Sequence, residues 1–379
     1  MDFTFTQEQQ QFSDALRRWV AKDYTFDDRK KIVRSDSGVS DAAWSTLAEL
    51  GMTALPIPEE QGGFSGSAID MLVVMQELGR GIVIEPYFAT VLGAEFLKLA
   101  GGHDAVLEQV ASGELKLAAA LGEKQSRHDL FDIATTATAN AGGYLISGTK
   151  TVVIHGAQAG KIIVSARSAG AQRDTDGISL FIVDADASGL SIRDYRTIDC
   201  QRAADISFEN VQVPATALLG ALGAGWDVLD AASDYGVTLL CAEAVGAMEA
   251  LNAATLEYMK TRQQFGVPIG KFQALQHRMA EMFMQLEQAR SMATLAAVKV
   301  SSPDADERRR TVSAAKARVG QAMKYVGQQA VQLHGGMGVT NELPAAHHFK
   351  RLTMIELTLG DTDHHLARFV AQPHFKHSA

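Results

Sequence analysis

The chain has 379 residues, of which 46% are hydrophobic and 21% charged, and its formal net charge is -9. This composition is typical of a soluble globular protein with two or three packed units, and the acidic balance argues against a nucleic-acid or membrane-surface partner. No apolar stretch approaches the ~20 residues of a membrane span, and the polar start MDFTFTQEQQ predicts neither a signal peptide nor a transit peptide. The isolated cysteines, Cys200 and Cys241, favour a reducing, cytoplasmic location.

Residues 1–117 have the pattern of an α-helical domain. Thr6 and Gln9 have the spacing of a capping box at the start of the first helix. A second helix is expected over residues 40–51, and the turn-rich stretch PIPEEQGGFSGS (56–67) precedes further helical patterns. This segment is therefore expected to consist of helices joined by short loops.

The pattern changes near residue 118. Short segments rich in β-branched residues, such as TVVIHGA and ISLFIVDA, alternate with Gly, Asn, Asp and Ser. This alternation continues to about residue 222 and predicts a central antiparallel β domain over residues 118–222.

The helical pattern returns after the β domain. Residues 226–261 contain no proline and are expected to form one long helix. The remaining helices are expected over residues 271–299, 304–333 and 345–371. Four long helices with short breaks predict a C-terminal four-helix bundle domain over residues 223–379. The chain is therefore expected to have an α+β fold with an N-terminal helical domain, a central β domain and a helical bundle.

The run KTRQQFGVPIGKFQALQHRMAEM (260–282) contains the most informative polar and aromatic side chains. Arg262 is charged at any relevant pH, and its planar guanidinium suits a pyrophosphate. Phe265 and Phe272 are placed to cover an adenine ring. The alternative is an ordinary helix–loop–helix connection, because basic and aromatic residues occur together in many loops.

The stretch QLHGGMGVTNELP (332–344) is a Gly-rich turn between two predicted helices. Gly335 and Gly336 lack a Cβ atom, so their backbone amides are able to approach a ligand closely. The turn follows no predicted strand, and it is therefore neither a Rossmann fingerprint nor a P-loop. A plain helix terminator is the alternative.

The motif LGDTDHH (359–365) gathers acidic and imidazole side chains. Asp361 and His365 would share a helix face, with His347 and His348 upstream. Zinc signatures are usually better spaced, so no metal ion is expected. An aspartate followed by a threonine equally suits a helix N-terminus. The chain contains no HExxH motif, CxxC pair or nucleophile elbow.

These motifs together make the chain resemble the acyl-CoA dehydrogenase family of flavoproteins. TRQQFGVPIGKFQALQHRMAEM is similar to the family's R-x-x-F-G-x-x-I-x-x-F-Q run, and VQLHGGMGVTNELP is similar to its Q-x-x-G-G-x-G turn. GTKTVVIHGAQAGKIIVSAR and PEEQGGFSGS resemble its central β stretch and N-terminal loop, so the resemblance covers essentially the whole chain. The start MDFTFTQEQQQF and the end GDTDHHLARF are most similar to small subunits of pimeloyl-CoA dehydrogenases and related bacterial proteins.

The resemblance implies FAD held between the subunits of a tetramer, and a reaction of fatty acid metabolism. In that reaction a carboxylate takes the α-proton of an acyl-CoA, and the β-hydrogen leaves as hydride to the flavin. Hydrogen bonds to the thioester carbonyl acidify the α-proton, and electrons pass on to electron-transfer flavoprotein. The expected FAD contacts are Arg262, Gln264, Phe265, Phe272, Gln332, Gly335, Gly336 and Thr362.

The sequence departs from the family around the reacting atoms. Gly360 occupies the position of the usual catalytic Glu, and Gly236 occupies the alternative position on the long helix. Glycine cannot accept a proton, so both base positions are empty. Val152, Val153 and Ile154 replace the Trp-Ile-Thr stretch that packs on the flavin ring, and the loop GEKQSRHD lacks the family's glycines.

Three hypotheses follow from these departures. In the first, the chain is the incomplete small subunit of an α2β2 heterotetramer, and a second acyl-CoA dehydrogenase-like subunit supplies the base. In the second, the chain is active in a homotetramer, and Asp361, or Asp234 near the other empty position, is the base, with burial raising the pKa of that carboxylate. Glu243, on the long helix, is more often expected in a buried helix–helix contact. In the third, the chain is a flavin-free scaffold.

Overall fold

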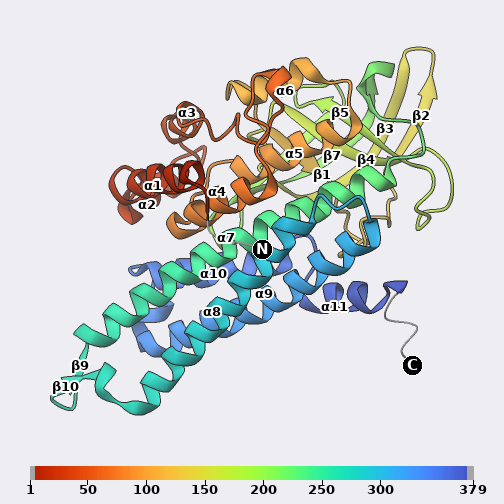
Figure 1. Cartoon of the computed structure of the whole chain (residues 1–379). Coiled ribbons are helices and arrows are strands. Elements are labelled where there is room, and N and C mark those ends of the chain that lie inside the picture. Colours follow the sequence, from red (N-terminus) through yellow and green to blue (C-terminus); the bar gives the residue numbers. More distant parts are fainter. Residues whose placement is uncertain (1–4, 374–379) are drawn as a thin grey trace. The chain divides into compact units, whose positions relative to one another are not determined.

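The computed structural model of the chain describes residues 5–373, with helices before and after a strand-rich segment of the sequence (Figure 1). The α-helices are α1 (Gln7–Lys22), α2 (Phe26–Arg34), α3 (Asp41–Glu49), α4 (Ala68–Gly81), α5 (Tyr87–Ala100), α6 (Asp104–Ala111), α7 (Trp226–Thr261), α8 (Gln273–Lys299), α9 (Ala305–His334), α10 (Pro344–Leu357) and α11 (Thr362–Val370). Short 3-10 helices are η1 (Glu59–Gln61), η2 (Ala215–Ala217), η3 (Ile269–Lys271) and η4 (Gly335–Val339). This order confirms the expected α+β fold.

Local sequence signals explain where the first helices begin. The hydroxyl of Thr6 accepts the N–H of Gln9 at 3.2 Å, and the Gln9 side chain accepts the N–H of Thr6 at 2.9 Å, which is the expected capping box. Ser40 caps α3 by accepting the N–H of Ala43 at 3.1 Å. Helices α2 and α6, of nine and eight residues, were not predicted from the sequence.

Strands β1 to β8 form one sheet in the middle of the sequence. They are β1 (Leu117–Ala120), β2 (Thr136–Asn140), β3 (Gly143–Ile154), β4 (Lys161–Arg167), β5 (Ile178–Asp184), β6 (Leu190–Arg196), β7 (Arg202–Val213) and β8 (Leu218–Leu219). Their order is β6-β7-β3-β2-β4-β5-β8, with β1 paired to β4. Neighbouring strands are antiparallel, except that β4 is parallel to β1 and, at one residue pair, to β2. Ile146, Ile162 and Phe181 are among the fully buried side chains of its core.

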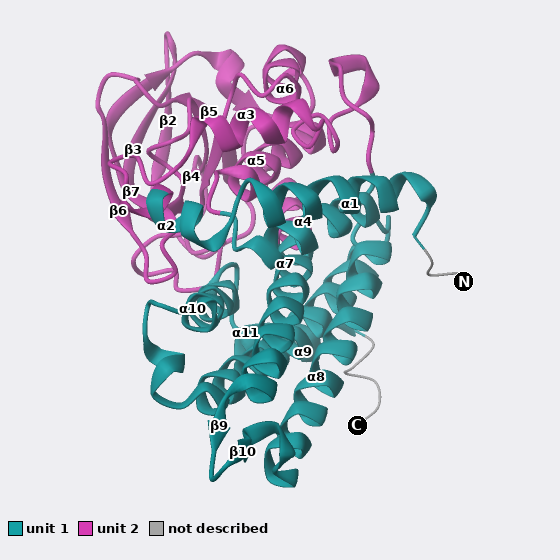
Figure 2. Cartoon of the chain, turned by 90° about the vertical axis from the view of Figure 1, so that its left-hand side faces the viewer, with its two compact units in different colours: residues 1–31, 67–83, 237–379 teal, residues 32–66, 84–236 magenta. Residues whose placement is uncertain are grey.

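Two compact units result from the contacts within the chain (Figure 2). Unit 1 comprises Met1–Lys31, Ser67–Val83 and Val237–Ala379, and unit 2 comprises Ile32–Gly66 and Ile84–Gly236. The sheet lies in unit 2, and helices α8 to α11 lie in unit 1. The N-terminal helices are shared: α1 and α4 pack together in unit 1, whereas α3, α5 and α6 belong to unit 2.

The helices of unit 1 pack around α9, which lies against α8, α10 and α11. α4 and α7 cross with their backbones nearly touching. A Cβ atom on Gly246 would lie 1.8 Å from the carbonyl oxygen of Gln76, and one on Gly79 would lie 2.0 Å from that of Glu243. Only glycine permits this crossing, because any side chain at either position would overlap the opposite backbone.

The single helix expected over residues 345–371 is wrong, because a turn divides it into α10 and α11. Leu359 and Gly360 have φ values of 54° and 105°, which a right-handed helix cannot contain. Asp361 then begins α11 as its N-cap. The motif LGDTDHH therefore lies at a helix start, and not along one helix face.

Among the described residues, one helix is long and apolar enough to cross a membrane by length and composition. This helix is α7, with 36 residues, and 78% of its most apolar window is buried inside the structure. Such burial is typical of the central helix of a globular protein.

Candidate functional site

A tight two-stranded hairpin follows α7 (Figure 2), and Phe265 in its loop is exposed to solvent. β9 (Gln263–Gln264) pairs with β10 (Val267–Pro268), so Phe265 and Gly266 form a two-residue loop. Their φ values are 54° and 75°, and a type I′ turn requires positive φ at both positions. Phenylalanine rarely adopts this conformation, yet the Phe265 side chain is 90% exposed. An exposed aromatic ring on a strained backbone indicates a binding role, since packing gives no reason for it.

Three further expected FAD contacts lie beside this hairpin. Arg262 is exposed, and no carboxylate among the described residues pairs with it, so its guanidinium is available to an anion. Phe272 lies edge-on to Phe265, with ring centroids 6.1 Å apart. Gln264 is exposed on β9. The structure thus brings a free cation and two aromatic rings together in one segment.

The Gly335–Gly336 turn lies next to the end of α7. The Tyr258 hydroxyl donates to the carbonyl oxygen of His334 at 3.3 Å, and the two rings lie 4.5 Å apart. A Cβ atom at either glycine would meet nothing within 4 Å, so this backbone is open. Gln332 is exposed just before the turn. Because Tyr258 lies one turn before Arg262, the two predicted FAD-binding segments share one end of unit 1.

Buried polar contacts fix the turn that contains Gly360. The amine of Lys316, which is fully buried, donates to the carbonyl oxygens of Ile355 and Thr358, both at 2.7 Å. Burial lowers the pKa of Lys316 to about 8. Lys316 thereby satisfies the last carbonyl groups of α10 and sets where that helix ends.

Two side chains hold the other half of the same turn. Nε2 of His365 donates to the carbonyl oxygen of Leu359 at 2.9 Å. Burial keeps the pKa of His365 well below its usual range, so the ring is neutral at pH 7. The carboxylate of Glu356 accepts the backbone N–H of Thr362 at 2.8 Å. The turn is therefore rigid, and Thr362 is placed in the first turn of α11.

The space beside Gly360, where the family's glutamate would start, is filled by imidazole rings. A Cβ atom at Gly360 would lie 2.6 Å from Nε2 of His365 and 2.6 Å from Cδ2 of His364. His365 does not replace the base on this side, because its Nε2 already carries the proton that it donates to Leu359. The position predicted for the C-terminal base therefore carries no carboxylate, and the two imidazole rings occupy the space beside it.

Asp361, the expected substitute base, caps α11. Its Oδ1 accepts the N–H of His364 at 2.8 Å, which confirms the helix-start interpretation of this motif. To take a proton at Oδ1, the Asp361 carboxylate would have to give up this hydrogen bond to His364. Asp234, the other candidate, is 1% exposed on α7.

Glu243 forms a buried ion pair with Arg351. Its two carboxylate oxygens lie 2.5 Å and 2.7 Å from Nε and Nη2 of Arg351, and both residues are buried. This pair joins α7 to α10, as expected for a helix–helix contact. Glu243 is therefore a structural residue, and its carboxylate is not available as a base.

Of the two upstream histidines, His347 is also bound to protein partners, and His348 is buried. Nδ1 of His347 accepts from Nη1 of Arg29 at 3.1 Å, and its Nε2 donates to the carbonyl oxygen of Asn341 at 3.3 Å. Burial lowers the pKa of His347 to about 4 and that of His348 to about 3. Among the described residues, no cluster of three His, Cys, Asp or Glu side chains is placed to hold a metal ion.

In unit 2, Glu123 is one of two carboxylates, with Asp129, that the loop GEKQSRHD shares with the family's pattern. It is buried, lies 2.7 Å from the amine of Lys150 and accepts the N–H groups of Ala134 and Thr135. Burial by itself would raise the pKa of Glu123, but Lys150 and these hydrogen bonds lower it. Glu123 therefore stays ionised and holds the loop in place.

The segment that replaces the family's flavin-ring contact is a β-bulge. The pairing of β3 with β7 shifts after Lys150, where Thr151 and Val152 together oppose the single residue Asp205. Val152 has a φ of 54° and its side chain is 52% exposed. A β-branched residue at positive φ is strained, so the bulge places an apolar surface outward at an energetic cost.

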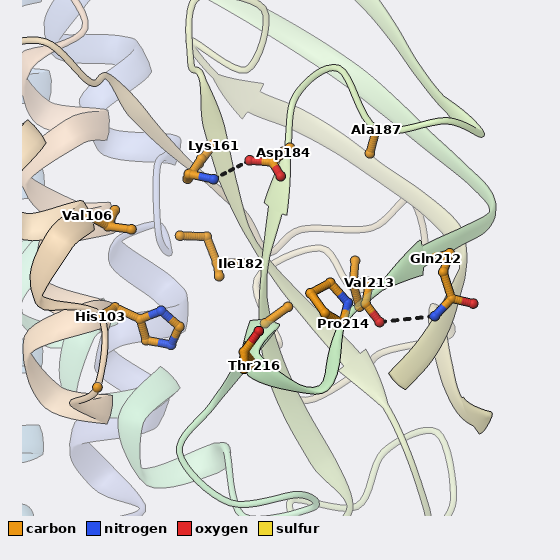
Figure 3. A pocket seen from close by; sticks show the side chains of 12 residues that line it. His103, Val106, Lys161, Ile182, Asp184, Ala187, Gln212, Val213, Pro214 and Thr216 are labelled. Carbon is orange, nitrogen blue, oxygen red and sulfur yellow. Dashed lines mark hydrogen bonds and ion pairs between the residues drawn. The ribbon is translucent and has the colours of Figure 1, made fainter. Parts of the chain in front are cut away.

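Two depressions lie on the surface of unit 2, and one of them borders the bulge at Val152. One borders the bulge and is lined by Lys124, Thr151, Val152, Arg193, Asp194, Tyr195 and Asp205. The other, of about 300 Å³, lies between the start of α6 and the ends of β4, β5 and β7, with the Lys161–Asp184 ion pair at its edge (Figure 3). It contains none of the predicted site residues.

Several residues that shape the site were not found from sequence. Lys316 occurs in an ordinary helical pattern, and His365 was considered only as a metal ligand. Nothing local indicates that either side chain meets the turn at Gly360. Asp205 lies on β7 opposite the bulge, and the strand sequence around it carries no signal of a functional role. The pair Phe265–Gly266 did carry a signal, because glycine at the second position suits a type I′ turn.

Comparison with known sequences gives a consistent result over the whole chain. Sequence models of the N-terminal, middle and C-terminal domains of acyl-CoA dehydrogenases match residues 6–114, 118–211 and 223–372. A probable acyl-CoA dehydrogenase of Bacillus subtilis, YngJ, is 30% identical over 374 residues, which are 96% of this chain and 97% of that protein.

Solved structures agree with the sequence matches. The FAD complex of PigA is 25% identical to this chain, with a TM-score of 0.90 and coverage of 99% of this chain and 100% of that one. The ChsE4–ChsE5 complex of Mycobacterium tuberculosis contains a chain that is 25% identical, with a TM-score of 0.87 and 97% coverage of both chains.

Proposed function

The chain belongs to the acyl-CoA dehydrogenase family, and on that premise we propose that it is part of a FAD-dependent oxidoreductase that dehydrogenates an acyl-CoA thioester. Bound FAD supplies the hydride acceptor of this reaction, and electron-transfer flavoprotein is the proposed next acceptor. The observation that carries the proposal is the exposed, unpaired Arg262 beside the outward ring of Phe265. These groups match the chemistry of a pyrophosphate and an adenine.

The adenine half of FAD fits the residues at this end of unit 1. Arg262 would bind the pyrophosphate, Phe265 and Phe272 would cover the adenine, and the open backbone at Gly335 and Gly336 would approach the phosphates. In the proposed assembly, these groups hold the flavin of a neighbouring subunit, with Gln264, Gln332 and Thr362 as further contacts.

The flavin-ring half fits less completely. Val152 offers an exposed apolar surface, but it has no aromatic face, and Ile154, at the position of the family's threonine, offers no hydroxyl. The chain's own residues therefore supply contact area at the ring and few directed bonds. This difference between the two halves supports a chain that contributes more to a partner's flavin than to its own.

We infer that the catalytic base comes from a second acyl-CoA dehydrogenase-like subunit. Gly360 is closed by His364 and His365, Asp361 caps α11, and Glu243 is bound to Arg351. The ChsE4–ChsE5 structure is a complex of two named chains, which supports pairing of unlike subunits as a possibility of this fold. The chain would then be the small subunit of a heterotetramer.

Purification of the chain alone and after co-expression with a second acyl-CoA dehydrogenase-like subunit tests this proposal. We expect a heterotetramer with flavin absorbance and acyl-CoA-dependent reduction of an artificial acceptor, and little turnover by the chain alone. A homotetramer with one FAD per chain and full turnover would overturn the incomplete-subunit proposal and favour the homotetramer with a base on this chain.

Two other hypotheses are separated by simple variants and spectra. If Asp361 is the base, Asp361→Asn abolishes turnover, because asparagine caps the helix but cannot take a proton. If the chain is a flavin-free scaffold, the purified chain shows no flavin absorbance, and replacing Arg262 does not change the flavin absorbance of its complex. A cytoplasmic location remains part of the proposal, and it rests on the two free cysteines, Cys200 and Cys241.

A further inference from the structure

The Val152 bulge contains a backbone N–H group that makes no hydrogen bond in the ladder between β3 and β7. In a bulge, two residues oppose one, so one amide loses its ladder partner. Here the amide of Val152 donates to Oδ1 of Asp205 at 3.2 Å, and Asp205 is the very residue that the bulge opposes on β7. A side chain has therefore taken over the bond that the backbone cannot make.

Two other side chains hold the Asp205 carboxylate in position. The hydroxyl of Tyr195 donates to Oδ1 at 3.0 Å, and Arg193 forms an ion pair with Oδ2. Both donors come from β6, where Arg193 is the direct cross-strand partner of Asp205. Burial would raise the pKa of Asp205, but these bonds outweigh burial and lower it. Asp205 is thus ionised and aimed at the bulge.

We propose that Asp205 is a positioning residue for the bound ligand: its carboxylate fixes the strained Val152 bulge and thereby sets the apolar surface on which a planar ring, the flavin, rests. This inference depends on the proposed function for the identity of the ring. The bulge itself is independent of that function. Asp205 acts through Val152 and does not contact the reacting atoms.

Asp205→Ala removes the acceptor, whereas Asp205→Asn keeps one carbonyl oxygen for the Val152 amide. Asp184→Ala is the matched control, because Asp184 also forms one ion pair across the same sheet but lies at the other depression (Figure 3). Arg193→Gln is a milder variant, since the Arg193 side chain is 78% exposed and its loss leaves the Val152 bond in place.

The first measurement uses the flavin-free full chain. Amide hydrogen exchange at Val152 should accelerate by about tenfold or more in Asp205→Ala, as expected for the loss of one charge-assisted hydrogen bond. Asp205→Asn and Arg193→Gln should show a smaller change, and Asp184→Ala none. Unchanged exchange at Val152 in a folded Asp205→Ala chain would overturn the proposal.

The second measurement uses bound FAD in the co-expressed complex. Asp205→Ala should shift the visible spectrum of the flavin whose ring rests on this chain's own bulge, and should weaken the binding of that FAD by about tenfold, with partial rescue by Asp205→Asn. An unchanged spectrum and affinity would overturn the ring-positioning role while leaving the proposed function intact. If the wild-type chain and its complex bind no FAD, the proposed function fails and the ring-positioning role fails with it, whereas Val152 exchange still decides the role of Asp205 in the bulge.

Discussion

A Cβ atom at Gly360 would lie 2.6 Å from Nε2 of His365, so the imidazole of His365 fills the space where a catalytic glutamate would begin. The same nitrogen donates to the carbonyl oxygen of Leu359 and holds the turn in its positive-φ shape. A glutamate at position 360 would therefore meet both the His365 ring and a backbone at positive φ. Replacing Gly360 alone is not expected to create a working base.

Gly360→Glu should not restore dehydrogenation and should destabilise the chain by about 2–4 kcal/mol, because backbone strain and overlap with His365 add. Urea unfolding of the flavin-free chain measures this. Gly101→Glu is the control for strain alone, since Gly101 has a φ of 73° and open space around it. Gly360→Glu combined with His365→Ala should recover part of the loss. Equal destabilisation by the Gly360 and Gly101 variants would contradict this account.

Glu243→Gln should destabilise the chain by about 3–5 kcal/mol, because it leaves Arg351 buried without its charge partner. The double variant Glu243→Met with Arg351→Met should cost less, since both buried charges are removed. Chemical unfolding of the flavin-free chain compares them. A stable Glu243→Gln chain whose complex has lost only its turnover would instead assign Glu243 to catalysis.

Asp361→Asn should leave the free energy of unfolding almost unchanged, whereas Asp361→Ala should lower it by about 1 kcal/mol, because only alanine loses the cap on α11. Thermal unfolding distinguishes the two variants. Turnover of the heteromeric complex should be the same for Asp361→Asn and wild type. A loss of turnover without a loss of stability would show that Asp361 takes the proton.

Stability should fall as pH drops below about 6.5, the ordinary pKa of histidine in the unfolded chain. The folded pKa values are about 4 for His347 and about 3 for His348, so the unfolded state binds more protons between these values and 6.5. Each residue should contribute a loss of up to about 2 kcal/mol at pH 5. Urea unfolding at pH 7, 6 and 5 measures it, with His277→Gln as an exposed-site control and His348→Gln as the test. Equal pH slopes for these two variants would refute the assignment.

Phe265→Asn should weaken FAD binding by up to about tenfold, because the aromatic surface is removed. The same change should stabilise the hairpin slightly, since asparagine followed by glycine is the preferred type I′ sequence. Flavin titration and thermal unfolding separate the two effects. A variant that binds FAD as tightly as wild type would remove Phe265 from the adenine site.

Sequence patterns predicted the domain order, because period and turn residues are local properties, whereas the FAD-binding segments were inferred from the family resemblance and stay a prediction. Thr6, Ser40 and the run of Gly335 and Gly336 behaved as their local signals indicated. The break between α10 and α11 was missed although Gly360 and Asp361 carry stop and start signals. Its geometry depends on Lys316, which lies more than forty residues upstream of Thr362 in the sequence and meets the turn only in three dimensions.

The residues that support the predicted flavin-ring contact could not be identified from the sequence for a similar reason. The residues Val152 to Ile154 indicated what is missing relative to the family, but the bulge arises from the pairing of β3 with β7. Asp205 gains its role only because it opposes that bulge. Long-range pairing therefore decides which side chains support the site.

The most direct test of the central claim is the flavin and subunit stoichiometry of the purified chain, measured together with its acyl-CoA dehydrogenase activity, alone and with a partner subunit. The account predicts negligible turnover for the chain alone and a flavin-containing heterotetramer that is active and loses FAD when Arg262 is replaced by alanine. A homotetramer of this chain that holds one FAD per subunit and turns over acyl-CoA at full rate would contradict it.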